Sequence, residues 1–276
     1  MGAAMADERV PERKQTGTYL FVRPKAARRG RDGATTGAID DVRAPPAPTS
    51  VAAVDTEEPA SGRPARLRYR RPKLDPEAID SRLVFFLAPD GAATEQYRQV
   101  AVALSGARAS PRRLWIAAAA PHAGATLTTA NLGSALTEFG RVTLVDATER
   151  PSGRALAALF GLGPTEPGGS GDHLDLWLLA DRLALQPHSG LLPLTVASAR
   201  NFQAVTAAAD FVLVEGPQIE SVDAVTAMKS LVDAVVLVIR PSDLGTGRYE
   251  RALDCLQGLN VIGVVVNGAT ENVLPA

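Results

Sequence analysis

Residues 114–132 read Leu-Trp-Ile-Ala-Ala-Ala-Ala-Pro-His-Ala-Gly-Ala-Thr-Leu-Thr-Thr-Ala-Asn-Leu, an apolar run followed by a short loop and a helix-like stretch. A strand, a glycine-containing loop and a helix form the phosphate-binding loop G-x-x-x-x-G-K-[S/T], whose backbone N–H groups cradle phosphates. Gly124 and Thr126 occupy the second glycine and the hydroxyl position. Ala119 and Ala125 stand at the first glycine and the lysine position. The stretch therefore predicts a phosphate-binding loop that lacks its lysine.

Apolar runs rich in valine, isoleucine and leucine recur along the chain, and helix-length segments separate most of them. Such runs suit strands that are buried on both faces, as in a parallel sheet. They predict strands at Leu114–Ala119, Val142–Val145, Leu192–Ala197, Phe211–Val214, Ala234–Ile239 and Val261–Val266. The intervening segments predict helices at Leu127–Phe139, Asn201–Ala209, Ser221–Leu231 and Arg248–Leu256. This alternation predicts a doubly wound α/β fold with a mostly parallel sheet.

The polar residues that follow these strands define a candidate site, because ligands of doubly wound sheets bind beyond the carboxyl ends of the strands. That edge is expected to carry the loop at Pro121–Thr126, Asp146, Glu215, Arg240 and Asn267. His122 lies in the loop, and a histidine side chain is not the permanent cation that a lysine is. We therefore interpret His122 as a solvent-facing loop residue and not as a replacement for the lysine.

Charge, cysteine content and hydropathy argue against a nucleic-acid-binding, a disulfide-stabilised or a membrane-spanning protein. A net charge of −1 over 276 residues gives no reason to expect nucleic acid as a partner. The single cysteine, Cys255, cannot form an intramolecular disulfide and is interpreted as a small core residue on a helix. No apolar stretch approaches the roughly 18–20 residues that span a bilayer, and no signal-peptide core is present. We expect a cytoplasmic protein whose membrane association, if any, is peripheral.

The first 80 residues differ in composition from the rest, which divides the chain into two parts at about residue 80. Residues 1–80 are rich in arginine, proline and small residues and are expected to be mostly disordered, whereas 81–276 form the globular domain. Thr18–Arg23 is β-prone, and reads either as a transiently ordered segment or as a strand that docks on a partner. The basic run Arg66–Lys73 reads as a solvated linker, with anionic lipid or nucleic acid as alternative contacts.

The order of motifs resembles that of the bacterial tyrosine-kinase and capsular-exopolysaccharide ATPase family, which is related to the ParA/MinD-type P-loop ATPases. The matching landmarks span residues 80–268 and are Asp80–Val84 with Glu95–Arg98, Pro121–Thr126, Val142–Asp146, Phe211–Pro217, Leu237–Arg240 and Gly263–Asn267. The resemblance implies a P-loop NTPase-like fold of the deviant Walker class. It also implies that Glu95 and Arg98 belong to an oligomerisation helix, so a homo-oligomer is one expectation.

The departures from the family pattern fall on the residues that carry the chemistry. Ala125 replaces the P-loop lysine, and Ala120 stands where the deviant subclass has its second lysine. Thr148 replaces the second carboxylate of the family's Asp-x-Asp, and Glu215 replaces the Walker B aspartate. The sequence also ends without the family's tyrosine-rich tail. Loss of the lysine removes a cation beside the γ-phosphoryl group, so we predict a pseudokinase with little or no phosphoryl transfer.

The resemblance implies a role in exopolysaccharide or capsule biosynthesis. The protein would regulate polymer length or export by binding, at the inner membrane, a membrane polysaccharide co-polymerase that is a separate chain. A residual site for ATP or ADP with magnesium would consist of Gly124, Ala125, Thr126, Asp146, Glu215 and Asn267, with magnesium at Thr126.

Two alternatives keep enzymatic activity. The first is an active ATPase or tyrosine autokinase of the same pathway, which would use another cation such as Arg150, Arg240 or an arginine of a partner. In that case Asp146 and Glu215 would be the catalytic carboxylates. The second is a ParA/MinD-like positioning ATPase, which would need ATP-dependent dimerisation. Loss of both lysine positions argues against each of them.

Overall fold

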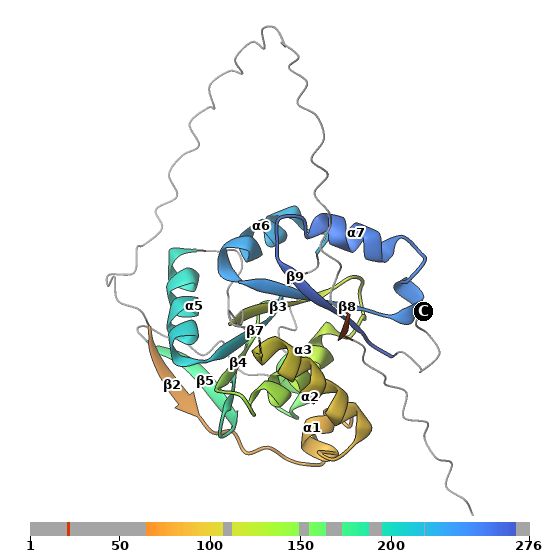
Figure 1. Ribbon diagram of the computed structural model, residues 1–276. Coiled ribbons are helices and arrows are strands. Elements are labelled where there is room, and N and C mark those ends of the chain that lie inside the picture. The colour runs from red at the N-terminus through yellow and green to blue at the C-terminus, as the bar shows by residue number, and fades with distance from the viewer. Residues whose placement is uncertain are drawn as a thin grey trace, which may run out of the picture. The chain divides into compact units, whose positions relative to one another are not determined.

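The computed structural model describes residues 21–22, 65–106, 112–148, 155–163, 173–187, 195–217 and 219–268. These residues form a nine-stranded sheet with helices on both faces (Figure 1). The strands are β1 (Phe21–Val22), β2 (Arg66–Arg70), β3 (Arg113–Ala118), β4 (Val142–Asp146), β5 (His173–Ala180), β6 (Leu183–Gln186), β7 (Phe211–Glu215), β8 (Ala234–Ile239) and β9 (Val261–Val266). The helices are α1 (Val84–Leu87), α2 (Ala92–Ser105), α3 (Ala125–Leu136), α4 (Ala155–Leu159), α5 (Val196–Ala208), α6 (Val222–Leu231), the short 3₁₀ helix η1 (Pro241–Asp243) and α7 (Arg248–Cys255).

The sheet has the strand order β1-β9-β8-β3-β7-β4-β6-β5-β2. The pairs among β9, β8, β3, β7, β4 and β6 are all parallel, as is the pair of β2 with β5. Only β1 with β9 and β5 with β6 are antiparallel among the described strands. The predicted doubly wound, mostly parallel α/β fold is therefore confirmed, and β8 and β9 have the bounds that the sequence predicts.

Each face of the sheet has its own hydrophobic core, because side chains alternate between the two faces of a strand. On β3, Leu114 and Ile116 belong to the core beneath α2 and α3, whereas Trp115 and Ala117 belong to the core beneath α5, α6 and α7. The two cores explain why the middle positions of the central strands are mostly apolar, with polar residues such as Asp146 and Glu215 at strand ends. A strand covered on both faces cannot place a polar side chain toward water.

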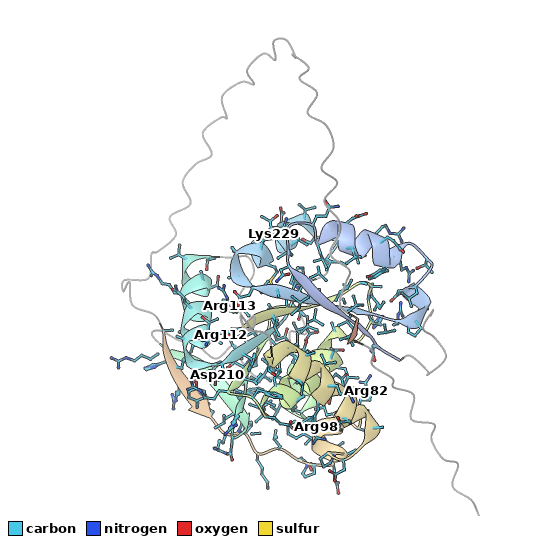
Figure 2. The ribbon with its side chains drawn as sticks, in the orientation of Figure 1. Arg82, Arg98, Arg112, Arg113, Asp210 and Lys229 are labelled. Atoms are coloured by element: carbon cyan, nitrogen blue, oxygen red, sulfur yellow. The ribbon has the colours of Figure 1, made fainter. Side chains whose placement is uncertain are left out.

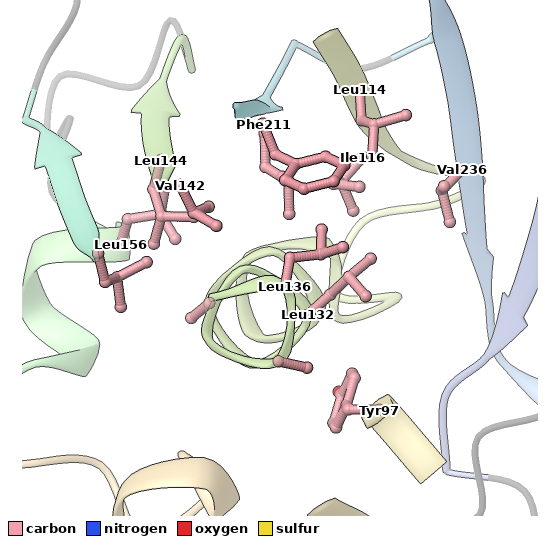
Figure 3. Close-up of a cluster of buried hydrophobic side chains, with 14 of the residues drawn as sticks. Tyr97, Leu114, Ile116, Leu132, Leu136, Val142, Leu144, Leu156, Phe211 and Val236 are labelled. Carbon is pink, nitrogen blue, oxygen red and sulfur yellow. The ribbon is translucent and has the colours of Figure 1, made fainter. Parts of the chain in front are cut away.

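Helix α3 is the most deeply buried helix and lies between the sheet and α2. Leu132 and Leu136 of α3 are fully buried between the sheet and Tyr97 of α2 (Figure 3). Burying one such leucine contributes about 1.5–3 kcal/mol to the free energy of unfolding. Tyr97 is itself almost fully buried and is a packing residue of this core. This packing fixes the helix that begins at the candidate phosphate-binding loop.

Two aspartates accept hydrogen bonds from the backbone at the amino-terminal ends of central strands. These ends lie at the edge of the sheet opposite to the loop. Asp233 accepts hydrogen bonds from the backbone N–H groups of Arg112 (3.0 Å) and Arg113 (2.9 Å) and pairs with the Arg113 guanidinium. Asp210 accepts from the N–H of Arg141 at 2.8 Å. Figure 2 shows Arg112, Arg113 and Asp210 well away from Arg82 and Arg98. Burial alone would raise the pKa of Asp233, but the bonds from Arg113 outweigh it and hold that pKa below its ordinary value.

The structure corrects the sequence prediction at one strand and adds four others, β1, β2, β5 and β6. A strand at Leu192–Ala197 is wrong in its described part, because Val196 and Ala197 begin α5 and Thr195 caps that helix. The Thr195 side chain accepts a hydrogen bond from the Ser198 N–H at 3.0 Å and forms a capping box with it. This helix start was not recognised from the sequence because the surrounding residues are apolar. Residues 192–194 lie outside the described part. The hairpin of β5 and β6 was not predicted from the sequence.

The sheet includes residues that precede the predicted boundary at residue 80. Arg66–Arg70 of the basic run form the edge strand β2, which pairs with β5 along its whole length, so the linker interpretation is wrong for these residues. Within the β-prone Thr18–Arg23 segment, Phe21 and Val22 pair with Val265 and Val264 of the same chain. The remainder of 1–64 lies outside the described residues. No described helix is both long and apolar enough to cross a bilayer.

Candidate functional site

The loop between β3 and α3 is held in a tight conformation by the neighbouring strands. The Ala119 N–H donates to the carbonyl of Val238 at 2.9 Å, and the Asn267 amide donates to the carbonyl of Ala123 at 2.9 Å. Gly124 has a φ of +97°, and a Cβ there would lie only 1.8 Å from Asn267 Nδ2. Position 124 therefore requires glycine for both its backbone conformation and its space.

This conformation places the first turn of α3 at the carboxyl edge of the sheet, as a phosphate-binding loop requires. The unbonded N–H groups and positive dipole of a helix amino terminus bind anions such as phosphate. Gly124 is the N-cap of α3 and no acidic side chain stands in its first turn. His122, predicted as a solvent-facing loop histidine, is indeed exposed and has a positive φ of 62°.

Oxygen ligands of the kind that magnesium prefers gather beside this loop. Asp146 and Glu215 end β4 and β7 and are direct partners in the sheet register. The hydroxyl of Thr126 donates a hydrogen bond to Glu215 Oε1. Asp146 Oδ1 accepts bonds from the Thr148 hydroxyl (2.7 Å) and N–H (3.1 Å). Both carboxylates are buried, and a hydroxyl with two carboxylates is a suitable partial ligand set for magnesium bound also to phosphate.

A cavity of about 770 Å³ opens over the loop and Glu215, whereas Asp146 is not among the residues that line it. Its lining includes Gly124, Ala125, Thr126, Thr148 and Glu215, so the structure brings together most of the residues predicted for nucleotide binding. A nucleotide of ordinary size fits such a volume. The cavity lies where the lysine-less loop would meet the phosphates of a bound nucleotide.

Arg82 lines the same cavity from the segment before α1, and the sequence did not single it out as a site residue. Among the described residues that line the cavity it is the only arginine or lysine. Its Nε donates to Asp80 Oδ1 at 2.9 Å and its Nη2 to Oδ2 at 2.7 Å. These bonds hold the pKa of Asp80 below its ordinary value, so the pair is ionised at neutral pH.

The backbone around Arg82 is tied to the rest of the site. Asn131 of α3 donates to the Arg82 carbonyl at 3.0 Å, and the Asp80 N–H donates to the Leu159 carbonyl at 2.9 Å. Two elements far apart in sequence thus place Asp80 and Arg82 at the cavity. Only the Asp80–Val84 landmark pointed to this segment, and it did so as a family motif and not as a ligand position.

Three other predicted residues have different places. Asn267 supports the loop through Ala123 and Gly124 and is not among the residues that line the cavity. Arg240 lines a second cavity, described below, and Arg150 lies outside the described residues. The prediction that Cys255 is a core residue is wrong: its side chain is exposed, because α7 buries Ala252 and Leu256 instead.

The predicted oligomerisation residues are both engaged within the chain. Arg98 pairs with Glu138 at 2.8 Å and with Glu95 at 3.7 Å, and its guanidinium lies over the Phe85 ring. The bond to Glu138 raises the pKa of Arg98 further above its ordinary value. These contacts join α2 to the end of α3, and a role of Glu95 and Arg98 in self-association stays a prediction.

Within the described part of the chain, no group of three or more His, Cys, Asp or Glu side chains could hold a metal ion. A magnesium ion at Thr126 and Glu215 would therefore depend on oxygen ligands from a nucleotide or water. This dependence is usual for magnesium, which keeps several waters and binds through one or two carboxylates plus phosphates.

No protein-family model and no curated protein sequence matches the chain. Solved structures do match. The chimerical protein CapA2B2 is 18% identical with a TM-score of 0.57, over 70% of this chain and 93% of that one. The BceF tyrosine kinase domain is 21% identical with a TM-score of 0.54, over 69% and 84% of the two chains. The VpsO kinase domain is 16% identical with a TM-score of 0.54, over 64% and 96%.

The fold and the loop geometry together define the class of protein. The chain has a P-loop-type α/β fold with the architecture of bacterial tyrosine kinase domains, as the order of its motifs predicts. At this level of sequence identity the likeness establishes the fold, and the function must be argued from the site.

Proposed function

We propose that this chain is a degenerate tyrosine-kinase-like protein that binds ATP or ADP with magnesium and transfers phosphate slowly or not at all. One observation supports this proposal most directly. The cavity retains the helix amino terminus at Gly124 that can bind phosphate and the Thr126–Glu215 pair that can bind magnesium (the magnesium corner), while Ala125 supplies no cation. Binding groups have persisted where the charge-neutralising group has been lost.

The loss of the lysine affects turnover more than binding. Backbone N–H groups hold phosphates in the ground state, but negative charge on the γ-phosphoryl oxygens must be neutralised in the transition state. Each 1.4 kcal/mol of lost stabilisation slows the reaction about tenfold. Arg82 is a cation on the same cavity, but it is bonded to Asp80, which partly neutralises its charge.

Magnesium, when bound, would neutralise charge on the terminal phosphates. Thr126 and Glu215 would hold the ion, directly or through water, and Asp146 would orient its waters. The hydrogen bond between Thr126 and Glu215 already aligns two of these groups. The residues present therefore suit a magnesium nucleotide.

Arg82 supports a second candidate, an active ATPase or autokinase of the same fold. The Arg82 side chain is 66% exposed and lines the nucleotide cavity, so a bound polyphosphate could compete with Asp80 for its guanidinium. This candidate requires that Arg82 exchange partners when nucleotide binds. It would then substitute for the cation missing at Ala125.

The pathway proposed for the protein is exopolysaccharide or capsule biosynthesis. The resemblance of its motifs to the capsular-polysaccharide kinases and the kinase-domain fold support this assignment. In it, the protein lies at the cytoplasmic face of the inner membrane and regulates polymer length or export through a membrane polysaccharide co-polymerase on a separate chain.

Calorimetric titration of ATP with magnesium tests the nucleotide proposal, with Ala125→Lys alongside the natural protein. We expect the natural protein to bind without measurable turnover and Ala125→Lys to bind at least about tenfold more tightly, as one charge-assisted hydrogen bond predicts. Turnover by the natural protein that is lost in Arg82→Ala would favour the active candidate. Absence of binding by both proteins would refute nucleotide binding altogether.

The pathway is tested separately by co-purification from membranes of cells that make the polymer, using the full-length chain and the chain without residues 1–64. Recovery of a polysaccharide co-polymerase identified by mass spectrometry is the expected result. Its absence with both chains would overturn the pathway assignment and leave the nucleotide proposal intact.

A further inference from the structure

A second cavity, of about 450 Å³, lies on the other side of the phosphate-binding loop. Three arginines line it, Arg240 after β8 and Arg248 and Arg251 on α7, and the loop contributes His122. It shares the Ala120–His122 stretch and Glu220 with the nucleotide cavity, so the loop forms a common wall between the two. Neither the sequence nor the proposed nucleotide site assigns any role to it.

A buried carboxylate fixes two of the three arginines. Asp243 is completely buried and accepts bonds from the Arg240 N–H (2.8 Å), the Arg240 guanidinium (3.3 Å) and the Arg248 guanidinium (3.5 Å). Burial alone would raise the pKa of Asp243, but these bonds outweigh it and keep that pKa below its ordinary value. An ionised Asp243 therefore orients two guanidinium groups whose outer N–H donors are left for another ligand.

The third arginine adds positive charge that no described residue pairs with. Arg251 lies one turn after Arg248 on α7, a spacing that places both on the same side of the helix. Within the described part of the chain, its side chain makes no ion pair or hydrogen bond, and its guanidinium lies near Gly247 at the start of the helix. Three guanidinium groups thus line the cavity with one carboxylate, that of Glu220, while Asp243 pairs with Arg240 and Arg248 from outside the lining.

We propose that the cavity of Arg240, Arg248 and Arg251 is an anion subsite that binds a phosphoryl group, separate from the nucleotide cavity. Arginine forks bind phosphate oxygens in pairs, and groups oriented beforehand lose less freedom on binding. A tetrahedral phosphate offers enough oxygens for three guanidinium groups. The phosphoryl group belongs to a phosphate monoester or to free phosphate that enters beside the loop.

Inorganic phosphate is the probe that tests the subsite, measured by calorimetry on the full-length protein at low ionic strength. Arg251→Ala is expected to weaken phosphate binding at least tenfold, because it removes a charged bidentate donor. Arg66→Ala is the matched control, since it removes an exposed arginine on β2, at the opposite edge of the sheet. It should change the affinity less than twofold. Equal affinity of wild type and Arg251→Ala, or no binding by the wild type, would overturn the proposal.

Two further measurements separate this subsite from the nucleotide cavity. Phosphate binding should persist in Thr126→Val, which lacks the hydroxyl of the magnesium corner, and saturating ATP with magnesium should not displace it. Displacement by ATP would show that the phosphate binds at the loop in the nucleotide cavity and would overturn a separate subsite. Because the probe is phosphate alone, the proposal stands or fails independently of nucleotide binding. Phenyl phosphate that binds more tightly than inorganic phosphate would identify a monoester as the ligand, whereas weaker binding would identify free phosphate.

Discussion

The Thr126 hydroxyl donates a hydrogen bond to Glu215 Oε1, which joins the first turn of α3 to the end of β7. Glu215 is only 5% exposed, so water cannot readily replace this donor if it is removed. The buried carboxylate would then lose a hydrogen bond without regaining its hydration, which lowers the free energy of unfolding. The bond links the two elements that flank the candidate magnesium position. The stability of the empty site and its response to magnesium should therefore depend on the same pair.

Thr126→Val is expected to lower the free energy of unfolding by about 1–3 kcal/mol, the usual cost of leaving a buried acceptor without its donor. Magnesium should also strengthen ATP binding less in this variant than in the natural protein. Urea unfolding and calorimetry with and without magnesium measure the two effects. Thr206→Val on α5 is the control, because the Thr206 hydroxyl bonds only to an exposed carbonyl, and its effect should stay below about 0.5 kcal/mol. Equal effects of both substitutions would contradict the prediction.

Gly124→Ala should destabilise the protein more than Gly245→Ala. Both glycines have positive φ values, +97° and +74°, so alanine costs about 1–2 kcal/mol of backbone strain at either position. At Gly124 the added Cβ would also meet Asn267 Nδ2 at 1.8 Å, whereas no atom lies within 4 Å of the corresponding position at Gly245. Urea unfolding of the two variants gives the comparison. Similar losses would mean that the loop moves away from Asn267 without cost.

Arg82→Ala should weaken the binding of ATP with magnesium about tenfold, because it removes the one lysine or arginine found in the described lining of the nucleotide cavity. Arg71→Ala is a close control, since Arg71 also pairs with an aspartate, Asp181, and is exposed to a similar degree. Its effect on ATP affinity should be less than twofold. An unchanged affinity in Arg82→Ala would show that Asp80 retains the guanidinium when nucleotide binds.

Asp233→Asn should destabilise the protein at neutral pH and have little effect in acid. A carboxyl whose pKa is lowered by folding contributes stability above its unfolded pKa, and this contribution is lost as the pH falls through the lower folded value. We expect a loss of about 1–3 kcal/mol above pH 5, which diminishes below the ordinary pKa of 3.8. Urea unfolding from pH 2 to 7 measures it. Asp254→Asn, at an exposed position, is the control, and its urea unfolding curves should differ little from those of the wild type at every pH. A loss of stability in Asp233→Asn that does not change with pH would contradict the role of the Asp233 charge.

The central strands were readable from sequence because burial on both faces leaves a continuous apolar run. Ala234–Ile239 and Val261–Val266 are such runs, and their predicted bounds agree with β8 and β9. The strand predicted at Leu192–Ala197 was wrong because it also rested on an apolar run. A short apolar run does not distinguish a strand from the start of a helix. There, the Thr195 capping box decided the local structure. Cys255 was predicted to be buried, but the buried residue is its neighbour Leu256. Adjacent side chains on a helix point about 100° apart, so an error of one residue exchanges a buried position for an exposed one.

By itself, the sequence determined the fold class, the position of the lysine-less loop and the strand ends at Asp146 and Glu215. These features are local, since they depend on hydrophobic pattern, on glycine and on where each strand stops. That Arg82 lines the nucleotide cavity, and that Arg240, Arg248 and Arg251 meet beside the loop, became visible in the folded chain alone. Their placement depends on contacts between segments far apart in the sequence, such as the bond of the Asp80 N–H to the Leu159 carbonyl and that of the Ala119 N–H to the Val238 carbonyl, which holds the loop beside β8.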